Sequence, residues 1–321
     1  MGTPTSENIL NDGVDFRELA IGIILLLQVI VGIWGNLSLL YHYLFLYHPP
    51  CRPRATDLIC KHLTLANFLV ILSTGVPQTM AALGLKYFFN DFACRLFLYF
   101  QRVFRGVSIG ATCLLSVFQT ITISPIDSCW MSLKVKAPKY VGSFISLCWI
   151  QCIFVNLSFP IYILYVSGKG CCVNITRKRD LGYCDTNHET ITSSVYVALI
   201  VFPEVSFSVL IIWASGSMVS TLYRHRQRVQ YIHRVHVSPR SSAESRATRR
   251  ILALVSTFVC FHTLSSIFRV AVALFQNPGW LVVNANALTS VCFPSISPFL
   301  LVSHSPFLPL TWPAPPKGKL Q

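Results

Sequence analysis

Four residues with strong hydrogen-bonding or ionic chemistry lie inside long apolar stretches of the chain. Gln101, Arg102 and Arg105 fall within one such stretch, and Glu204 lies in another. An unpaired charge in hydrocarbon costs a few kcal/mol or more, so ionisable residues at such positions usually serve a function. An arginine fork can donate to a sulfate, carboxylate or carbonyl, which makes these residues candidate ligand contacts in a cavity open to the outside. The alternative interpretation is an internal Arg–Glu pair that fixes helix packing without any ligand.

One short motif has the form of a catalytic motif. Residues Gly106 to Gly110 fit the G-x-S-x-G pattern of a serine nucleophile, but that pattern needs a strand–turn–helix setting with His and Asp partners. Here it lies in the middle of an apolar stretch, so we interpret the two glycines as a G-x-x-x-G contact for close helix packing. The sequence has no H-E-x-x-H, P-loop or Cys/His metal spacing, and we therefore expect no enzyme activity, metal site or cofactor.

The elements that must position these residues are membrane-spanning helices. The chain is 53% hydrophobic and 12% charged, whereas a soluble domain carries about 25% charged residues. About 20 apolar residues in a helix cross about 30 Å of hydrocarbon. Seven stretches meet this length, namely 19–46, 58–84, 94–123, 139–166, 191–223, 249–275 and 280–303. We predict an all-α membrane protein whose residues 19–303 form a seven-transmembrane helix bundle.

The distribution of charge predicts how the bundle is oriented. If the N-terminal segment 1–18 lies outside, most Lys and Arg residues fall in cytoplasmic segments, as the positive-inside rule requires. Most acidic residues then lie outside. The net charge of +14 thus indicates orientation and contact with anionic membrane lipids, and does not indicate a nucleic-acid site.

Several residues on the predicted outer side could form a disulfide or carry a glycan, as residues of extracellular segments do. Cys94 begins the third apolar stretch at the outer face, and Cys184 lies in the following outer loop. Both face the oxidising side, so a disulfide between them is chemically allowed, although Cys171 and Cys172 share the same loop and their roles stay open. Asn174 lies in a sequon of this loop and is the predicted glycosylation site.

The last segment, 304–321, is rich in proline and is predicted to be a cytoplasmic tail. An amphipathic helix along the membrane needs an apolar stripe and a cationic face. Each interior proline costs a helix about 3 kcal/mol, and both lysines of the tail follow the last proline. We therefore predict no eighth helix and an extended tail.

Several motifs along the chain point to one receptor family. They are K-H-L-T-L-A-N at 61–67, G-V-P-Q-T-M at 75–80, R-G-V-S-I-G-A-T-C-L-L-S-V-F-Q at 105–119, D-L-G-Y-C at 180–184, W-A-S-G-S-M at 213–218, S-P-R at 238–240, L-V-S-T-F at 254–258 and C-F-P-S-I-S-P-F at 292–299. On these motifs the sequence resembles the vomeronasal type 1 receptors over nearly all of residues 16–303.

The resemblance implies a G-protein-coupled receptor in the plasma membrane that detects a small, pheromone-like molecule and signals through an inhibitory-type G protein. Cys94 and Cys184 match the positions of the family disulfide. The basic segment 224–250 lies on the predicted inner side, and we predict that Arg246, Arg249 and Arg250 contact the G protein there.

Some positions depart from the related pattern. His262 stands where we expect Tyr, and Asn67 stands where many related receptors carry a sodium-binding Asp. Glu204 keeps the acidic charge that the family often supplies as Asp. The Pro-rich tail replaces a basic, aromatic ending, so a receptor remnant with impaired signalling is one alternative function. A transporter or channel is another, although we find no internal repeat of the kind that transporters show.

Overall fold

The computed structural model describes most of the predicted bundle. The described residues are 16–46, 55–85, 91–123, 131–168, 178–180, 185–187, 239–274 and 279–302, together with parts of 202–223, where the longest helical run is 209–217. The tail and the loop residues Asn174 and Cys184 lie outside this part of the chain, as does Glu204.

The first two predicted spans are helices that contain wider turns. α1 (Phe16–Tyr41) continues into η1 (His42–Leu46), and α2 (Ala55–Val70) continues through η2 (Ile71–Gly75) into α3 (Val76–Ala82). The two η segments are π-helical. Pro77 follows η2 closely, and a proline lacks the backbone N–H and crowds the carbonyl four residues earlier. The π turn thus lies where the regular hydrogen-bond ladder must be interrupted.

A glycine ends the second span. Gly84 has a φ of 94°, a left-handed conformation that glycine adopts without steric cost. The Leu85 amide donates to the Met80 carbonyl and the Gly84 amide donates to the Ala81 carbonyl. These are the two bonds of a Schellman motif, which caps the free carbonyls at a helix end. The span therefore ends near residue 84, as the sequence predicts.

The remaining labelled elements are four long helices and two short strands that the sequence did not predict. They are α4 (Asp91–Ile123), α5 (Met131–Gly168), β1 (Lys178–Asp180), β2 (Asp185–Asn187), α7 (Pro239–Leu274) and α8 (Trp280–Val302). The strands pair antiparallel, with Asp180 opposite Asp185. α5 and α7 begin eight and ten residues before the predicted spans, because an apolar pattern marks the hydrocarbon region whereas a helix can continue into water.

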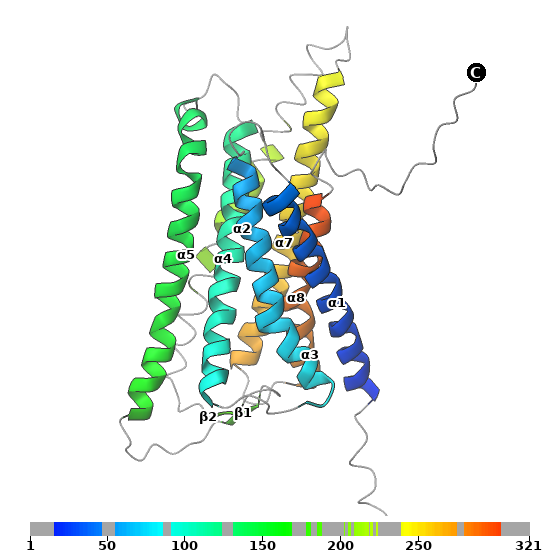
Figure 1. The fold of residues 1–321 in the computed structure, drawn as a ribbon, viewed down its shortest axis with the longest axis vertical. Coiled ribbons are helices and arrows are strands. Elements are labelled where there is room, and N and C mark those ends of the chain that lie inside the picture. Colours follow the sequence, from blue (N-terminus) through cyan, green and yellow to red (C-terminus); the bar gives the residue numbers. More distant parts are fainter. Residues whose placement is uncertain are drawn as a thin grey trace, which may run out of the picture.

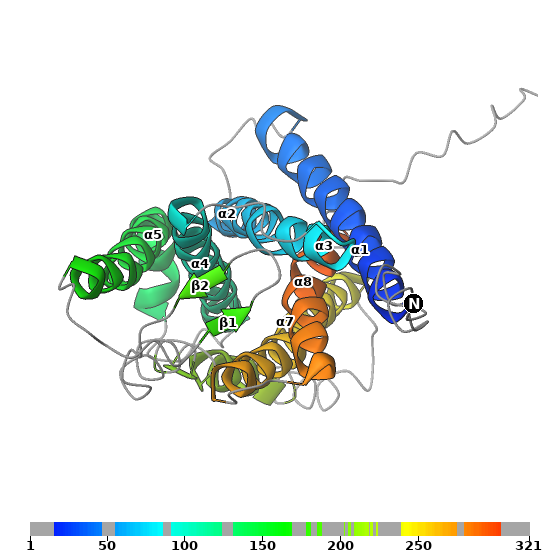
Figure 2. The same cartoon turned by 90° about the horizontal axis from the view of Figure 1, so that it is seen from below.

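The helices form a bundle in which α2 and α4 hold the most buried of the candidate spans. α2 packs on α4, α4 on α5, α7 on α8 and α8 on α1, as Figures 1 and 2 show. Five helical stretches among the described residues are long and apolar enough to cross a membrane. The candidate spans in α2 and α4 are each 61% buried, whereas those in α1 and α5 are 28% and 17% buried. α1 and α5 therefore present most of their apolar surface to lipid.

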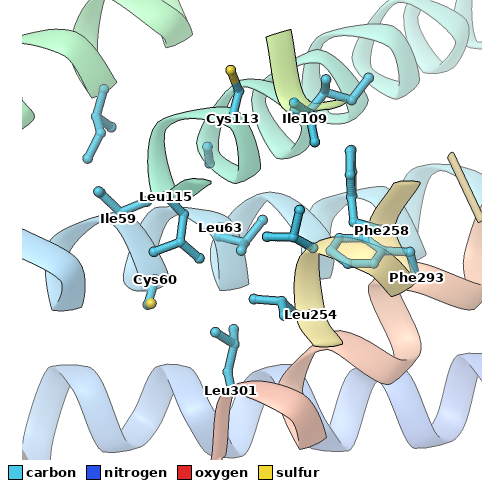
Figure 3. Packing of buried hydrophobic residues seen from close by; sticks show 14 of the residues in the cluster. Ile59, Cys60, Leu63, Ile109, Cys113, Leu115, Leu254, Phe258, Phe293 and Leu301 are labelled. Carbon is cyan, nitrogen blue, oxygen red and sulfur yellow. The ribbon is translucent and has the colours of Figure 1, made fainter. Parts of the chain in front are cut away.

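The largest apolar cluster joins six labelled helices, α5 contributing Ile145, and the helical run 209–217. Leu63 of α2, Ile109 of α4, and Phe258 of α7 with Phe293 of α8 belong to it, and Leu39 adds α1. Phe258 and Phe293 meet edge to face with ring centroids 4.7 Å apart. Figure 3 shows Leu63, Phe258 and Phe293 converging between the helices. This packing fixes the helix positions that support the polar groups described next.

Candidate functional site

Arg105 is the one buried cation among the residues that the structure describes. Its side chain is 9% exposed and reaches from α4 to α7. One terminal nitrogen donates to Ser265 Oγ at 3.0 Å, and the other lies 3.4 Å from both Ser266 Oγ and His262 Nδ1. Ser265 Oγ lies 3.1 Å from Ser290 Oγ of α8. A single guanidinium thus connects three helices through serine hydroxyls and an imidazole.

The contact with Arg105 assigns a role to one ring nitrogen of His262. A guanidinium only donates hydrogen bonds, so His262 Nδ1 is the acceptor in this 3.4 Å contact. The ring stacks on Phe258 with centroids 5.2 Å apart. The substitution of His for the expected Tyr therefore supplies an acceptor to the buried arginine. Sequence reasoning missed this role, although His262, Ser265 and Ser266 have the spacing of one helix face.

Gln101 and Arg102 lie about one turn outward from Arg105 on α4. Gln101 Nε2 donates to Thr74 Oγ1 of η2 at 2.9 Å, so this amide points to the second span and Arg105 points to α7. Arg102 is half-buried. Gln101 and Arg105 thus lie at neighbouring depths on α4, but their side chains contact different helices. The fourth predicted contact, Glu204, lies outside the described residues.

A second polar network lies deeper in the bundle. Ser108 Oγ donates to Asn67 Oδ1 at 2.6 Å, and Asn67 Nδ2 donates to Ser297 Oγ at 2.7 Å. Ser297 Oγ then donates to the Pro294 carbonyl at 3.3 Å. Asn67 is fully buried. The three side chains therefore form a series of hydrogen bonds in which each donates to the next, and this series connects α4 and α2 to α8.

The Pro294 carbonyl, at the end of this series of hydrogen bonds, is free to accept side-chain donors because of the sequence of α8. Residue 298 is a proline, so it has no N–H to bond the Pro294 carbonyl four residues earlier. Asn36 of α1 replaces that donor, since its Nδ2 donates to this carbonyl at 2.9 Å. The asparagine is fully buried. α1 is thus attached to α8 at the point where the backbone ladder of α8 is interrupted.

The glycine motif in α4 is a packing contact, as predicted. A methyl group at Gly106 would lie 2.9 Å from Cys152 Sγ of α5, and one at Gly110 would overlap Cys148 Sγ. The intervening Ser108 lies in the helix and donates to Asn67. The motif therefore serves close approach of α4 and α5, and the strand–turn–helix of a nucleophile is not formed there.

The other predicted site residues are described only in part. Cys94 is buried and disulfide-bonded, and its partner lies outside the described residues. β2, which begins directly after Cys184, contacts α4, and Figure 1 shows it beside the end of the bundle where α4 begins. Arg246, Arg249 and Arg250 lie on α7 with the spacing of one helix face.

Comparison with known proteins gives relatives over nearly the whole chain. Vomeronasal type-1 receptor 4 from Homo sapiens is 53% identical over 291 residues, covering 90% of this chain and 95% of the relative. Vomeronasal type-1 receptor 2 from Homo sapiens is 54% identical over 282 residues, covering 88% and 71%. Olfactory receptor class A-like protein 1 from Danio rerio is 28% identical over 286 residues, covering 88% and 89%.

The fold is also similar to a solved receptor. The crystal structure of squid rhodopsin matches with a TM-score of 0.63 at 15% identity, covering 89% of this chain and 84% of that chain, so this likeness concerns the seven-helix fold alone. No relative or structure among these supports the transporter alternative. The model of the vomeronasal organ pheromone receptor family matches residues 19–312. The chain therefore belongs to this family of chemosensory G-protein-coupled receptors.

Proposed function

We propose that this receptor binds a small, pheromone-like molecule with an oxygen acceptor in the outer half of the bundle, and that Arg105 converts binding into movement of α7. The observation that carries the proposal is the contact of Arg105 with His262, Ser265 and Ser266. None of the three is an anion, because two are serine hydroxyls and the third is an imidazole. Hydrogen bonds to an ionised acceptor are roughly twice as strong as neutral ones. A sulfate, carboxylate or polarised carbonyl therefore competes effectively with these three groups for the guanidinium.

Ligand binding then has a structural consequence for α7. When a ligand oxygen replaces the serine hydroxyls at Arg105, α4 and α7 lose a direct connection. Gln101, Arg102 and Glu204 are the proposed ligand contacts around Arg105. Gln101 supports this assignment because its amide already lies about one turn from Arg105, held by Thr74.

The test compares three substitutions of Arg105 in cells that express a G-protein activation reporter. Arg105→Ala, Arg105→Lys and Arg105→Gln are assayed against paired steroid ligands that differ only in a sulfate or a hydroxyl group. We expect Arg105→Ala to lower the potency of the sulfated ligand at least about tenfold, since truncating one partner of a buried charged contact typically costs about 2–5 kcal/mol. Arg105→Lys keeps the charge but loses the fork, and should give an intermediate potency.

The same experiment includes an outcome that would contradict the proposal. Surface level is measured by an epitope tag for every variant. If Arg105→Ala abolishes surface expression, and the double variant Arg105→Leu, Glu204→Leu restores it, then the two residues form a packing pair. Arg105 is in that case a structural residue and the ligand assignment is wrong.

We further propose that the receptor couples to an inhibitory-type G protein at the inner end of α7. Arg246, Arg249 and Arg250 lie on this helix, whose outer part holds the Arg105 acceptors, so movement at one end changes the other. Replacing the three arginines with Gln should reduce activation of a purified inhibitory-type G protein without lowering surface level. Lys136→Gln with Lys139→Gln at the exposed start of α5 is the matched control. Equal loss in the control would show only a general charge effect.

The proposed location is the plasma membrane, with the N-terminus and the loop that contains Asn174 outside. Glycosylation of Asn174 would support this orientation and is testable on the full chain. We expect a deglycosylase to increase the gel mobility of the surface receptor, and we expect Asn174→Gln to remove that shift. Asn156→Gln is the control, because Asn156 lies within α5 and its amide bonds to the Cys152 carbonyl. A shift that persists in Asn174→Gln would contradict the assignment.

A further inference from the structure

The two sides of α5 differ in their surroundings. One side packs against the bundle through Ile145 and Cys152, which are buried, and through Trp149, whose indole donates to His62 of α2 at 3.3 Å. The other side exposes large apolar groups, including Leu147 at 58% and Phe154 at 67%. Figure 2 shows α5 at the edge of the bundle beside α4. Lipid therefore covers the outward side in a single receptor.

Gln151 is out of place on this outward side. Its side chain is exposed and has no hydrogen-bond partner among the described residues. Each of the other Asn and Gln residues in the described helices is at least partly buried. Gln151 lies about 22 Å along the helix from Lys136 at 1.5 Å per residue, within the candidate span Lys136–Leu157. Lipid tails offer no hydrogen bonds, so an amide at this depth requires a protein partner.

The residues around Gln151 have the spacing of a helix–helix seam. Phe144, Leu147, Gln151 and Phe154 follow one another at intervals of three, four and three residues. This is the alternation of a and d positions in a pair of supercoiled helices. A single polar residue at an a position is a known means of fixing the register and number of helices in such a pair. The three apolar residues of this seam are all more than half exposed, Phe144 being 52% exposed.

An amide is complementary to a second copy of itself, because it both donates and accepts. Two receptors in one membrane share the same orientation, so a twofold axis along the membrane normal brings equal residues to equal depth. α1 is also exposed to lipid, but its amides are already used inside the bundle. Gln28 donates to Cys292 Sγ and Asn36 to the Pro294 carbonyl. Only α5 thus combines an exposed apolar face with an exposed amide among the described helices.

We propose that the outward face of α5 is a homodimer interface, in which Gln151 of one receptor hydrogen-bonds Gln151 of a second copy. Phe144, Leu147 and Phe154 pack around this pair. The interface leaves the outer half of the bundle and the inner end of α7 accessible, so dimerisation is independent of the ligand and G-protein proposals.

The first test measures association of the full-length receptor in lipid bilayers. Copies labelled with donor and acceptor fluorophores are reconstituted at several protein-to-lipid ratios, and the dissociation constant is obtained from energy transfer. We expect Gln151→Leu to weaken association about tenfold, the effect of about 1.4 kcal/mol. Gln151→Asn should keep most of the association, because it retains the amide. Gln151 faces lipid, so neither variant should change the surface level or ligand response.

The second test locates the interface by cross-linking. Cys260 is exposed on α7, so it is first replaced by serine to remove a reactive thiol. Leu147→Cys and Phe154→Cys should then form intermolecular disulfides in membranes, whereas Trp34→Cys on α1, which is 72% exposed, should not. Equal association of Gln151→Leu and the unmodified receptor would overturn the proposal. Cross-linking that occurs at residue 34 but not at residues 147 and 154 would also overturn it.

Discussion

The network around Asn67 gives a prediction whose size follows from the structure. Asn67→Leu keeps a similar volume but removes the bond from Ser108 at 2.6 Å and the bond to Ser297 at 2.7 Å. Hydrogen bonds between helices in a membrane protein average about 0.6 kcal/mol and reach about 1.7 kcal/mol. Two such bonds at a fully buried site predict a loss of about 1–3 kcal/mol in the free energy of unfolding.

The measurement is reversible unfolding of the purified receptor in mixed micelles with increasing denaturing detergent. A double-mutant cycle with Ser297→Ala isolates the contact between the two side chains, and residues in direct contact couple by about 0.5 kcal/mol or more. Thr112→Val is the matched control. Thr112 is as deeply buried as Asn67, but its hydroxyl bonds to the Ser108 carbonyl within its own helix. A loss no larger for Asn67→Leu than for Thr112→Val, with no coupling to Ser297, would refute the reasoning.

Two further predictions concern the contact between α4 and α5 and the disulfide. Gly110→Ala should lower the free energy of unfolding by about 1–3 kcal/mol, because the added methyl group overlaps Cys148 Sγ. Adding Cys148→Ala should restore most of the lost free energy of unfolding, and absence of this rescue would contradict the contact. The control is Gly216→Ala, which should leave the free energy of unfolding unchanged because nothing lies within 4 Å of that position. Non-reducing peptide mapping should find Cys94 linked to Cys184, and Cys184→Ser should lower surface expression. A link from Cys94 to a different cysteine would show that the predicted pairing is wrong.

The positions of the spans that the structure describes could be predicted from sequence, because length and hydropathy alone define them. Even the end of the second span at Gly84 follows from a residue that tolerates positive φ. The π turn at Ile71–Gly75 could not be located, because a proline predicts an interruption but does not determine its form. The motif predicts a close helix contact at Gly106 and Gly110. It does not predict that α5 makes this contact, because the glycine pattern carries no information about the neighbouring helix.

The candidate site was predictable in type but only partly in arrangement. A buried arginine in an apolar stretch indicates a polar neighbourhood, and Arg105 has one. Its acceptors on α7 were not identified, because serine and histidine at positions 262, 265 and 266 do not lower the hydropathy of the helix enough to mark it as polar. Arg102 and Arg105 are three residues apart and were expected on one face, yet Arg105 is buried whereas Arg102 is only half-buried. The pairing of either residue with Glu204 stays a prediction.

The interruption at the Pro294 carbonyl has a consequence for the mechanics of α8. An uninterrupted helix resists bending because every backbone hydrogen bond must lengthen on one side. At this point Asn36 supplies the missing bond from a different helix, so stiffness depends on a side chain of α1. Bending α8 toward or away from α1 therefore changes the length of a bond between helices, without breaking the backbone. α1, at the edge of the bundle, thereby influences how easily the inner end of α8 moves. Substitutions at Asn36 should alter the resting activity of the receptor while leaving ligand selectivity unchanged.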